Sequence, residues 1–313
     1  MRISEMKTGS SVEGFFLLKE AAVKQTKDGK PYFSGKVSDS TGEVPLTVWD
    51  YTGEVKPEHV GGVVKVRGSI SEYRNAPQII ATRIRMKTDA DNVDLSTLVP
   101  AAPQDTEIMV NEVVRLISSI KDIELAKLCS AMLNKHKAQW LSAPAAMGMH
   151  HAFLHGLLMH TSSMMRMADT VASVYPFANR DLILAGCFLH DFGKLSEYEF
   201  SALGLMTSMS VKGQLFGHLV MGALEVRDTA VEMKVSKEKV DILCHIILSH
   251  HGNPEWGAAV KPACVEAEIV SLLDLMDARA EEYREALENI EMGKMSPNKV
   301  AGLDHRVVNH GLS

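Results

Sequence analysis

The stretch "CFLHDFGKLSEY", residues 187–198, carries an apolar run into the adjacent pair His190 and Asp191 and then, one turn later, to Lys194. The apolar residues before the pair, "DLILAGCFL", are typical of a buried helix. A buried carboxylate without a partner is costly. The sequence therefore predicts that a cation compensates Asp191, and that its other ligands come from elsewhere in the chain.

Histidines are concentrated in the second part of the chain, where 12 of the 13 follow residue 130. A single histidine among apolar residues is usually a hydrogen-bonded core group, and His136, His245, His305 and His310 are interpreted in this way. Imidazole and carboxylate groups on several predicted helices instead indicate a site for Zn, Mn, Fe or Mg. The candidate groups are His150, His151, His155, His160, His190, Asp191, His218, His250, His251, Asp274 and Asp277.

Two of these carboxylates, Asp274 and Asp277, are one helical turn apart and share one face. Asp274 directly follows an apolar run and is predicted as a ligand, whereas Asp277 is predicted to anchor a ligand from behind. Lys194 faces the same way as His190 and Asp191, which favours a phosphate-binding role. The alternative for Lys194 is a solvated lysine at a helix end.

The first 90 residues have the pattern of strands rather than helices. Apolar, β-tolerant segments are separated by turn signals such as "KDGK" and "STGE". Five short strands in a domain of this size indicate a small barrel, most often of the oligonucleotide-binding (OB) type. The predicted strands are residues 13–26, 31–39, 44–50, 61–73 and 77–87.

Charge also separates the two parts, because residues 1–90 hold 14 Lys and Arg against 11 Asp and Glu in a chain of net charge -6. A mildly basic barrel suits single-stranded nucleic acid, which such proteins bind by stacking and by phosphate contacts. The alternative is that the aromatic residues form the barrel core and the charges a solvated edge. The candidates are Phe33, Trp49 and Tyr73 for stacking, and Lys36, Arg67, Arg74, Arg83 and Arg85 for phosphates.

An acidic, proline-containing segment, residues 89–106, is predicted to be a linker between a domain at 1–88 and one at 107–313. Beyond it the apolar period becomes helical. The second domain is therefore predicted to be an all-α bundle. Its expected helices are residues 107–120, 122–137, 149–173, 179–191, 214–231, 236–249 and 262–289.

The bulk properties fit a cytoplasmic protein. The 313 residues are 46% hydrophobic and 23% charged, and no run approaches the roughly 20 apolar residues of a membrane span. The start of the sequence lacks the pattern of a signal peptide. The four cysteines are scattered without a CxxC motif, which predicts reduced thiols. No membrane partner is expected, and association into a homo-oligomer is left open.

At this point the motifs resemble a known family. His160-Thr161, His190-Asp191 and Asp274 resemble the skeleton of the HD superfamily of metal-dependent phosphohydrolases. The blocks "APAAMGMHHAFLHGLLMHT", "LAGCFLHDFGKLSEYEF" and "LSHHGNPEWGAAVKPACVEAEIVSLLDLMDAR", behind an OB-like domain, resemble the YhaM-type 3′→5′ exoribonucleases. This resemblance covers nearly the whole chain.

The resemblance implies roles for these residues. One metal site would be formed by His160, His190, Asp191 and Asp274. Asp191 would bridge to a second ion held by His218 and His250, with His251 close by. Lys194 would bind phosphate, and His150 and His151 would line the substrate path. The chain departs from the family pattern with His155 in place of a glycine, Met159 in place of an acid, and no His-x-Ala before Asp274.

The resemblance also implies the reaction. The expected activity is 3′→5′ hydrolysis of single-stranded RNA to nucleoside 5′-monophosphates, with single-stranded DNA as a further candidate substrate. Water would attack with the help of two divalent ions, Mn²⁺ being expected and Fe, Zn, Mg and Co the alternatives. Two other interpretations stay open. One is an HD phosphohydrolase acting on free or cyclic nucleotides, and the other an OB-type binding protein with a structural metal domain.

Overall fold

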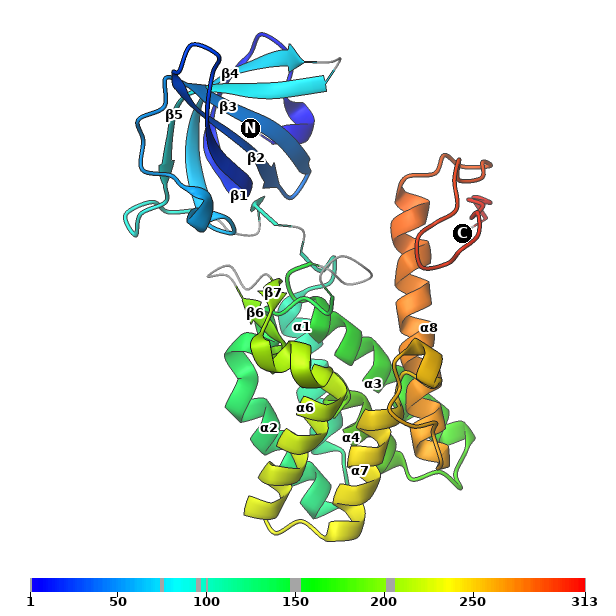
Figure 1. Cartoon of the computed structure of the whole chain (residues 1–313). Helices are drawn as coiled ribbons and strands as arrows, with labels where there is room; N and C mark the ends of the chain where they lie inside the picture. Colours follow the sequence, from blue (N-terminus) through cyan, green and yellow to red (C-terminus); the bar gives the residue numbers. More distant parts are fainter. Residues whose placement is uncertain are drawn as a thin grey trace. The chain divides into compact units, whose positions relative to one another are not determined.

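The computed structural model of the chain describes residues 2–73, 76–93, 97–99, 101–146, 153–200 and 206–312, and of Tyr73 only the backbone. The contacts within the chain define two units (Figure 1). The first is made chiefly by Met1–Ala101, and the second by Ala102–Glu199 with Met206–Ser313. No helix in the described ranges is long and apolar enough to cross a membrane.

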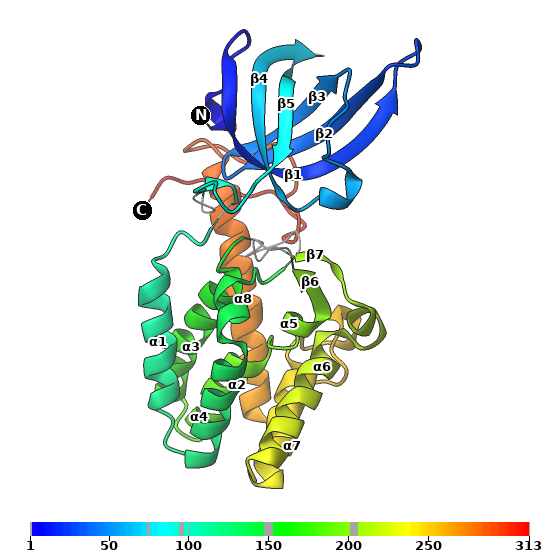
Figure 2. The ribbon, with the colours of Figure 1, turned by 90° about the vertical axis from the view of Figure 1, so that its left-hand side faces the viewer.

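The first unit is a closed five-stranded barrel of the predicted OB-like type (Figure 2). The strands close in the order β1-β2-β3-β5-β4, and all neighbours are antiparallel except the β3–β5 pair. The bounds are β1 (Ser11–Gln25), β2 (Pro31–Asp39), β3 (Gly42–Trp49), β4 (Val63–Tyr73) and β5 (Ala76–Met86), with short 3-10 turns at Ile3–Glu5 and Pro57–His59.

The length of β1 allows the barrel to close. Its first half, Ser11–Leu17, pairs with β4, and the part from Leu17 to Gln25 pairs with β2, with a register shift between Leu18 and Glu20. Such a bulge bends a strand so that it serves two neighbours. The inward residues of all five strands form one apolar core, which includes Phe16 and Phe33.

The second unit is helical, and seven of its helices correspond to the predicted segments. The expectation of an all-α domain was wrong in one detail, because two short strands form a two-stranded sheet between α5 and α6. The helices are α1 (Thr106–Ser118), α2 (Ile123–Ser142), α3 (Gly156–Val174), α4 (Arg180–Leu189), α5 (Lys194–Glu197), α6 (Val211–Glu232), α7 (Lys237–Ser249) and α8 (Val265–Glu288), and the strands are β6 (Tyr198–Phe200) and β7 (Met206–Met209).

Local sequence explains where several helices begin. The side chains of Asp105, Asp122 and Asn179 each accept hydrogen bonds from backbone N–H groups in the first turn of the helix that follows. The four cysteines, all in described parts of the chain, are free thiols. After α8 the chain continues to Leu312 with one isolated bridge between Met295 and Val308.

Candidate metal centre

The six side chains predicted as metal ligands meet inside the helical unit, although five helices supply them or lead into them. His160 lies on α3, and His190 and Asp191 follow the last residue of α4. His218 lies on α6, His250 follows the last residue of α7, and Asp274 lies on α8. His160, His190, Asp191 and His250 are buried almost completely. The pair that ends the apolar run of α4 is therefore at the centre of the unit.

A glycine explains how the turn after α4 approaches α6. A Cβ atom on Gly193 would lie 2.0 Å from the carbonyl oxygen of His218 and 2.8 Å from the nitrogen of Gly222. No other residue fits this contact without moving the backbone. The sequence "HDFGK" thus brings Asp191 and Lys194 next to the helix that carries His218.

A second glycine sets the position of His218 on α6. Gly217 has φ 68° and ψ 163°, so the helix is interrupted there and starts again at His218. The first N–H group of the restarted helix needs an acceptor. The backbone nitrogen of His218 donates to Oε1 of Glu197 at 2.9 Å. Its ring Nδ1 donates to the same oxygen at 3.2 Å.

All four predicted histidine ligands are held in the same way. Nδ1 of His190 donates to the carbonyl of Cys187 at 2.9 Å, and Nδ1 of His250 donates to the carbonyl of Ile247 at 2.7 Å. Because a carbonyl can only accept, the proton of each neutral ring is on Nδ1 and the lone pair is on Nε2. Nδ1 of His160 donates to Oδ2 of Asp277 at 2.7 Å. This is the usual anchoring of metal-binding histidines.

The free faces of these rings point toward one another. Nε2 of His160 lies 3.2 Å from Nε2 of His190 and 3.2 Å from Oδ1 of Asp274. Without a proton or a cation between them, two lone pairs and a carboxylate at such distances would repel one another. His160, His190 and Asp191, and likewise His190, His250 and Asp274, offer donor atoms within 4.8 Å of one another.

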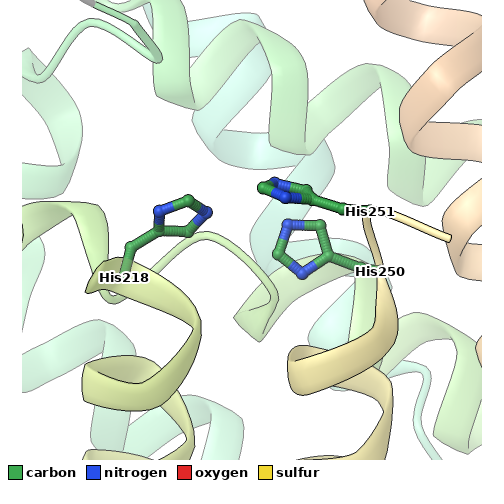
Figure 3. Close-up of side chains that lie close together, drawn as sticks. All are labelled: His218, His250 and His251. Atoms are coloured by element: carbon green, nitrogen blue, oxygen red, sulfur yellow. The ribbon is translucent and has the colours of Figure 1, made fainter. Parts of the chain in front are cut away.

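A second group of donors lies on the other side of Asp191. His218, His250 and His251 also offer nitrogens within 4.8 Å of one another. Figure 3 shows the ring of His218 reaching from α6 toward the rings of His250 and His251 at the end of α7. Oδ2 of Asp191 is 3.3 Å from Nε2 of His190, whereas Oδ1 is 3.7 Å from Nε2 of both His218 and His250. Each carboxylate oxygen thus faces one group.

Unsatisfied atoms test whether a divalent metal fits these residues. Oδ1 of Asp191 and Nε2 of His218 are buried and have no hydrogen-bond partner among the described residues. Buried polar atoms are normally satisfied, and exceptions need an explanation. Neutral imidazole nitrogens and carboxylate oxygens are the donors that divalent metals take. The residues therefore fit a divalent cation on each side of Asp191.

The electrostatics favour a deprotonated ligand set around Asp191. Burial alone would raise the pKa of Asp191, but the positive charge of Lys194 is the largest opposing cause, and this pKa is held well below its usual range. Burial is the main cause that lowers the pKa of His250 far below its ordinary value, so its ring is neutral. A metal ligand must be deprotonated in this way.

The pKa of His160 is shifted in the opposite direction to that of His250. Burial lowers its pKa, but Asp274 and Asp277 outweigh burial and raise the pKa to about 10. The carboxylates that stabilise a proton on this ring would equally stabilise a divalent cation in the place of that proton.

Lys194 is not the solvated lysine of the alternative interpretation. Its Nζ lies 2.7 Å from Oδ2 of Asp191, and its side chain is largely buried. Burial would lower its pKa, but Asp191 reverses the shift and raises it. A charged lysine is therefore held beside the donor groups.

The remaining candidates in this unit have different positions. Asp277 lies behind His160, as described above, and His251 belongs to the second donor group. His155 precedes α3 with φ 66°, in the left-handed region that favours glycine, and its Nδ1 donates to the carbonyl of Leu141 at 2.6 Å. His150 and His151 lie outside the described residues.

Glu197 is a residue of this site that the sequence interpretation missed. It is buried, and both contacts that fix His218 end on its carboxylate. Burial would raise the pKa of Glu197, but the hydrogen bond and charge of His218 outweigh it and lower the pKa. The motif contains this glutamate three residues after Lys194, but its spacing does not indicate that His218 is its partner.

The barrel changes the list of candidate nucleic-acid contacts. Phe33 is completely buried in the barrel core, so its prediction as a stacking residue was wrong. Trp49 is 54% exposed and lies beside Tyr32, which the sequence interpretation did not include. Arg74 and the side chain of Tyr73 lie outside the described residues.

Most of the basic candidates on the barrel have acidic partners. Lys36 pairs with Glu20 at 2.8 Å, and Arg67 lies 3.6 Å from Glu13. Arg85 makes two hydrogen bonds to Asp91 at 2.7 and 2.8 Å. Arg83 is exposed and has no ion pair among the described residues. Among the described residues, Trp49 is therefore an exposed aromatic candidate and Arg83 an exposed basic candidate without an acidic partner.

Comparison with known proteins places the donor groups within a recognised domain. The family model described as HD domain matches residues 157–279, which include all six predicted ligands. Proteins named 3′-5′ exoribonuclease YhaM from Listeria monocytogenes, Listeria welshimeri and Listeria innocua are each 35% identical over 306 residues. These alignments cover 97% of this chain and 96% of each relative.

Solved structures similar to this chain match part of it. The second OB-fold domain of replication protein A from Methanococcus maripaludis covers 30% of this chain and 98% of its own length, with 21% identity and a TM-score of 0.23. An OB domain from Thermoplasma acidophilum covers 30% of this chain and 90% of its own, with 11% identity and a TM-score of 0.25.

Proposed function

This chain belongs to the family of 3′-5′ exoribonucleases represented by YhaM, with an HD domain, and from this premise we propose that it degrades single-stranded RNA from the 3′ end. The products would be nucleoside 5′-monophosphates, and single-stranded DNA is a second candidate substrate. We propose that residues 1–88 bind the strand, that residues 89–106 connect the two domains, and that residues 107–313 carry out hydrolysis. We place the activity in the cytoplasm.

The observation that carries this proposal is the position of Asp191 between two donor groups. One oxygen faces His190 and the other faces His218 and His250. We propose that His160, His190, Asp191 and Asp274 hold one divalent ion, and that Asp191, His218 and His250 hold another with His251 close by. Mn²⁺ is the expected ion, although nitrogen and oxygen donors also accept Fe, Zn, Mg and Co.

Hydrolysis of the last linkage breaks the bond from phosphorus to O3′ of the preceding nucleotide. The oxygen of water joins the phosphorus, and a proton passes to the leaving O3′. When bound, divalent ions supply charge that acidifies water and stabilises both the attacking and the leaving oxygen. The protein contributes the fixed ligand geometry, and Lys194 would contact the phosphate and offset its developing negative charge.

The barrel would hold the strand upstream of this site. Its exposed Trp49 offers a face for a base, and Arg83 offers a cation that lacks an acidic partner among the described residues. An enzyme for free nucleotides has no need of such a surface. This is why we favour a polynucleotide substrate over a free or cyclic nucleotide.

Two measurements on purified protein test the proposal. Metal analysis is expected to find two divalent ions per chain. With Mn²⁺, a 5′-labelled single-stranded RNA is expected to shorten in single-nucleotide steps, while free nucleoside triphosphates persist. Hydrolysis of the free nucleotides without shortening of RNA would contradict the proposal. The same experiment on a DNA strand of matching sequence decides between the two nucleic acids.

A further inference from the structure

A cavity of about 670 Å³ extends from the metal centre between the segment after α7 and helix α8. Asp191, His250 and Asp274 lie at one end of its lining, together with Lys194. The rest of the lining includes Trp256 and Lys261 from the segment after α7, and Ser271, Leu272 and Leu275 from α8. Pockets for small organic ligands have volumes of about 300–1,000 Å³, so this cavity has room for a nucleotide.

Large apolar side chains line this cavity without being buried by the protein. Trp256 is 61% exposed, Leu272 55% and Leu275 38%. Single exposed apolar residues are common, but an aromatic ring and two leucines in one concave surface indicate a binding site. A flat apolar group such as a nucleobase would cover them.

The segment that carries Trp256 is held in place by its own backbone. The nitrogen of Trp256 donates to the carbonyl of Asn253 at 2.9 Å, and the nitrogen of Ala259 donates to the carbonyl of Leu248 at 2.9 Å. Gly252 and Gly257 have φ of 78° and 107° and permit the turns on either side. A ring on such a support is positioned before the ligand arrives, which reduces the entropy lost on binding.

The lining of the cavity is mixed in charge, with Lys194 and Lys261 as its cations and Asp191, Asp274 and the exposed Glu268 as its acids. Lys194 lies at the metal end, and Lys261 is exposed and makes no ion pair with any described residue. A nucleotide in this cavity would have its phosphate between the donor groups and Lys194, and its base against Trp256. The exposed Lys261 remains available for the negative charge of the strand.

We infer that this cavity is the subsite for the 3′-terminal nucleotide, with Trp256 stacking on its base and Leu272 and Leu275 contacting it from α8. This inference rests on the proposed exonuclease function and deepens it. Stacking accepts any base, because every base has a π-face, as stepwise degradation requires. The subsite also explains why hydrolysis would proceed from a terminus, since the cavity has room for about one nucleotide beyond the scissile linkage.

Equilibrium binding to the full-length protein loaded with Mn²⁺ tests the subsite without any turnover. Adenosine 5′-monophosphate and ribose 5-phosphate share the phosphate and the sugar but differ in the base. The wild type is expected to bind the former about 5- to 100-fold more tightly, which is the range for one stacked base. Trp256→Ala is expected to abolish this difference, and Trp256→Phe to keep most of it.

Kinetics on a dinucleotide provide the second measurement. Trp256→Ala is expected to raise the KM by about 5- to 100-fold. Phe177→Ala is the matched control, because Phe177 is an exposed aromatic residue of the same unit outside the cavity lining, and its KM should equal that of the wild type. A Trp256→Ala protein with normal melting temperature, unchanged discrimination and unchanged KM overturns the subsite while RNA hydrolysis stands. A wild type that shows the base preference but leaves RNA intact overturns the exonuclease proposal and supports the nucleotide site.

Discussion

The barrel and the helical unit use charged groups in opposite ways. On the barrel, Lys36, Arg67 and Arg85 lie at the surface and pair with nearby carboxylates. In the helical unit, His190, Asp191 and His250 are buried and depend on one another. Surface ion pairs contribute little to the stability of the fold, whereas removal of the partners of a buried charged group destabilises the protein strongly. We therefore expect single substitutions to have very unequal effects in the two units.

The largest effect is expected from Asp191→Asn. This change removes the charge shared by both donor groups and should lower kcat/KM on single-stranded RNA at least about 1,000-fold. Binding of the same RNA, measured on the barrel-containing full chain, should stay within about 2-fold of the wild type. Asp241→Asn on α7 is the matched control, because Asp241 is exposed and pairs with Lys237 across one turn. Equal loss of binding and turnover in Asp191→Asn would show that the two units do not have separate roles.

The next largest effects are expected from two substitutions that each weaken one of the two donor groups. Glu197→Gln weakens the support of His218, and Asp277→Asn weakens the support of His160. Each change should lower affinity for one ion about 10- to 100-fold, as is usual for the carboxylates behind metal-binding histidines. Titration of metal-free protein with Mn²⁺ should show one weakened and one unchanged binding event in each variant. Simultaneous weakening of both events in both variants would mean that the donor groups act as a single site.

The residues of this centre differ in how far the sequence could predict them. His190 and Asp191 were predictable because polar groups that end an apolar helix are unusual in any core. Glu197 was not, because its partner is 21 residues away and becomes adjacent only through the interruption of α6 at Gly217. The strands β6 and β7 were missed because segments of three and four residues have no measurable apolar period.

The barrel also has a feature that depends on contacts between residues far apart in the sequence and that the local pattern could not predict. Alternation along β2 puts the neighbours Tyr32 and Phe33 on opposite faces of the strand, but alternation does not say which face is inside. Closure of the barrel decides this, and closure depends on pairing between β1 and β4, which lie far apart in the sequence. Phe33 was therefore assigned to the wrong side, whereas Trp49 remained a candidate.

A smaller effect on the kinetics is expected from Trp49→Ala, a substitution on the barrel. Loss of one stacked base should raise the KM on a long single-stranded RNA about 5-fold or more and leave the KM on a dinucleotide unchanged. A dinucleotide has a single nucleotide upstream of the scissile linkage, whereas the barrel is proposed to hold the longer upstream strand. Trp49→Phe should restore most of the loss. This result would also separate Trp49 from Trp256, whose substitution should act on both substrates. An equal rise in the KM on both substrates after Trp49→Ala would contradict the role of the barrel as a strand guide.

The smallest effect is expected from a partly buried ion pair of the helical unit that lies outside the metal centre. Glu225 on α6 accepts from Nε2 of His136 at 2.7 Å and lies 2.8 Å from Nζ of Lys135. The hydrogen bond from His136 is the main cause that lowers the pKa of Glu225 from 4.5 to about 2. Because the folded state binds this proton less tightly than the unfolded state, the stabilisation is complete above the unfolded pKa and is lost as the pH falls toward the folded one.

Glu225→Gln should therefore reduce the free energy of unfolding of the helical unit by about 1 kcal/mol near neutral pH, a value discounted for solvent screening. Urea unfolding at about pH 7 and about pH 3 measures the difference from the wild type. This difference should shrink at the lower pH, because that pH lies below the pKa of 4.5 of Glu225 in the unfolded wild type, so the unfolded state gains a proton that the folded state, with a pKa of about 2, largely does not bind. The barrel transition should be identical in the two proteins. A difference that persists or grows at low pH would mean that the substituted amide side chain disturbs packing between α2 and α6. In that case a partly buried ion pair of the helical unit would not behave like the weakly stabilising ion pairs on the barrel surface.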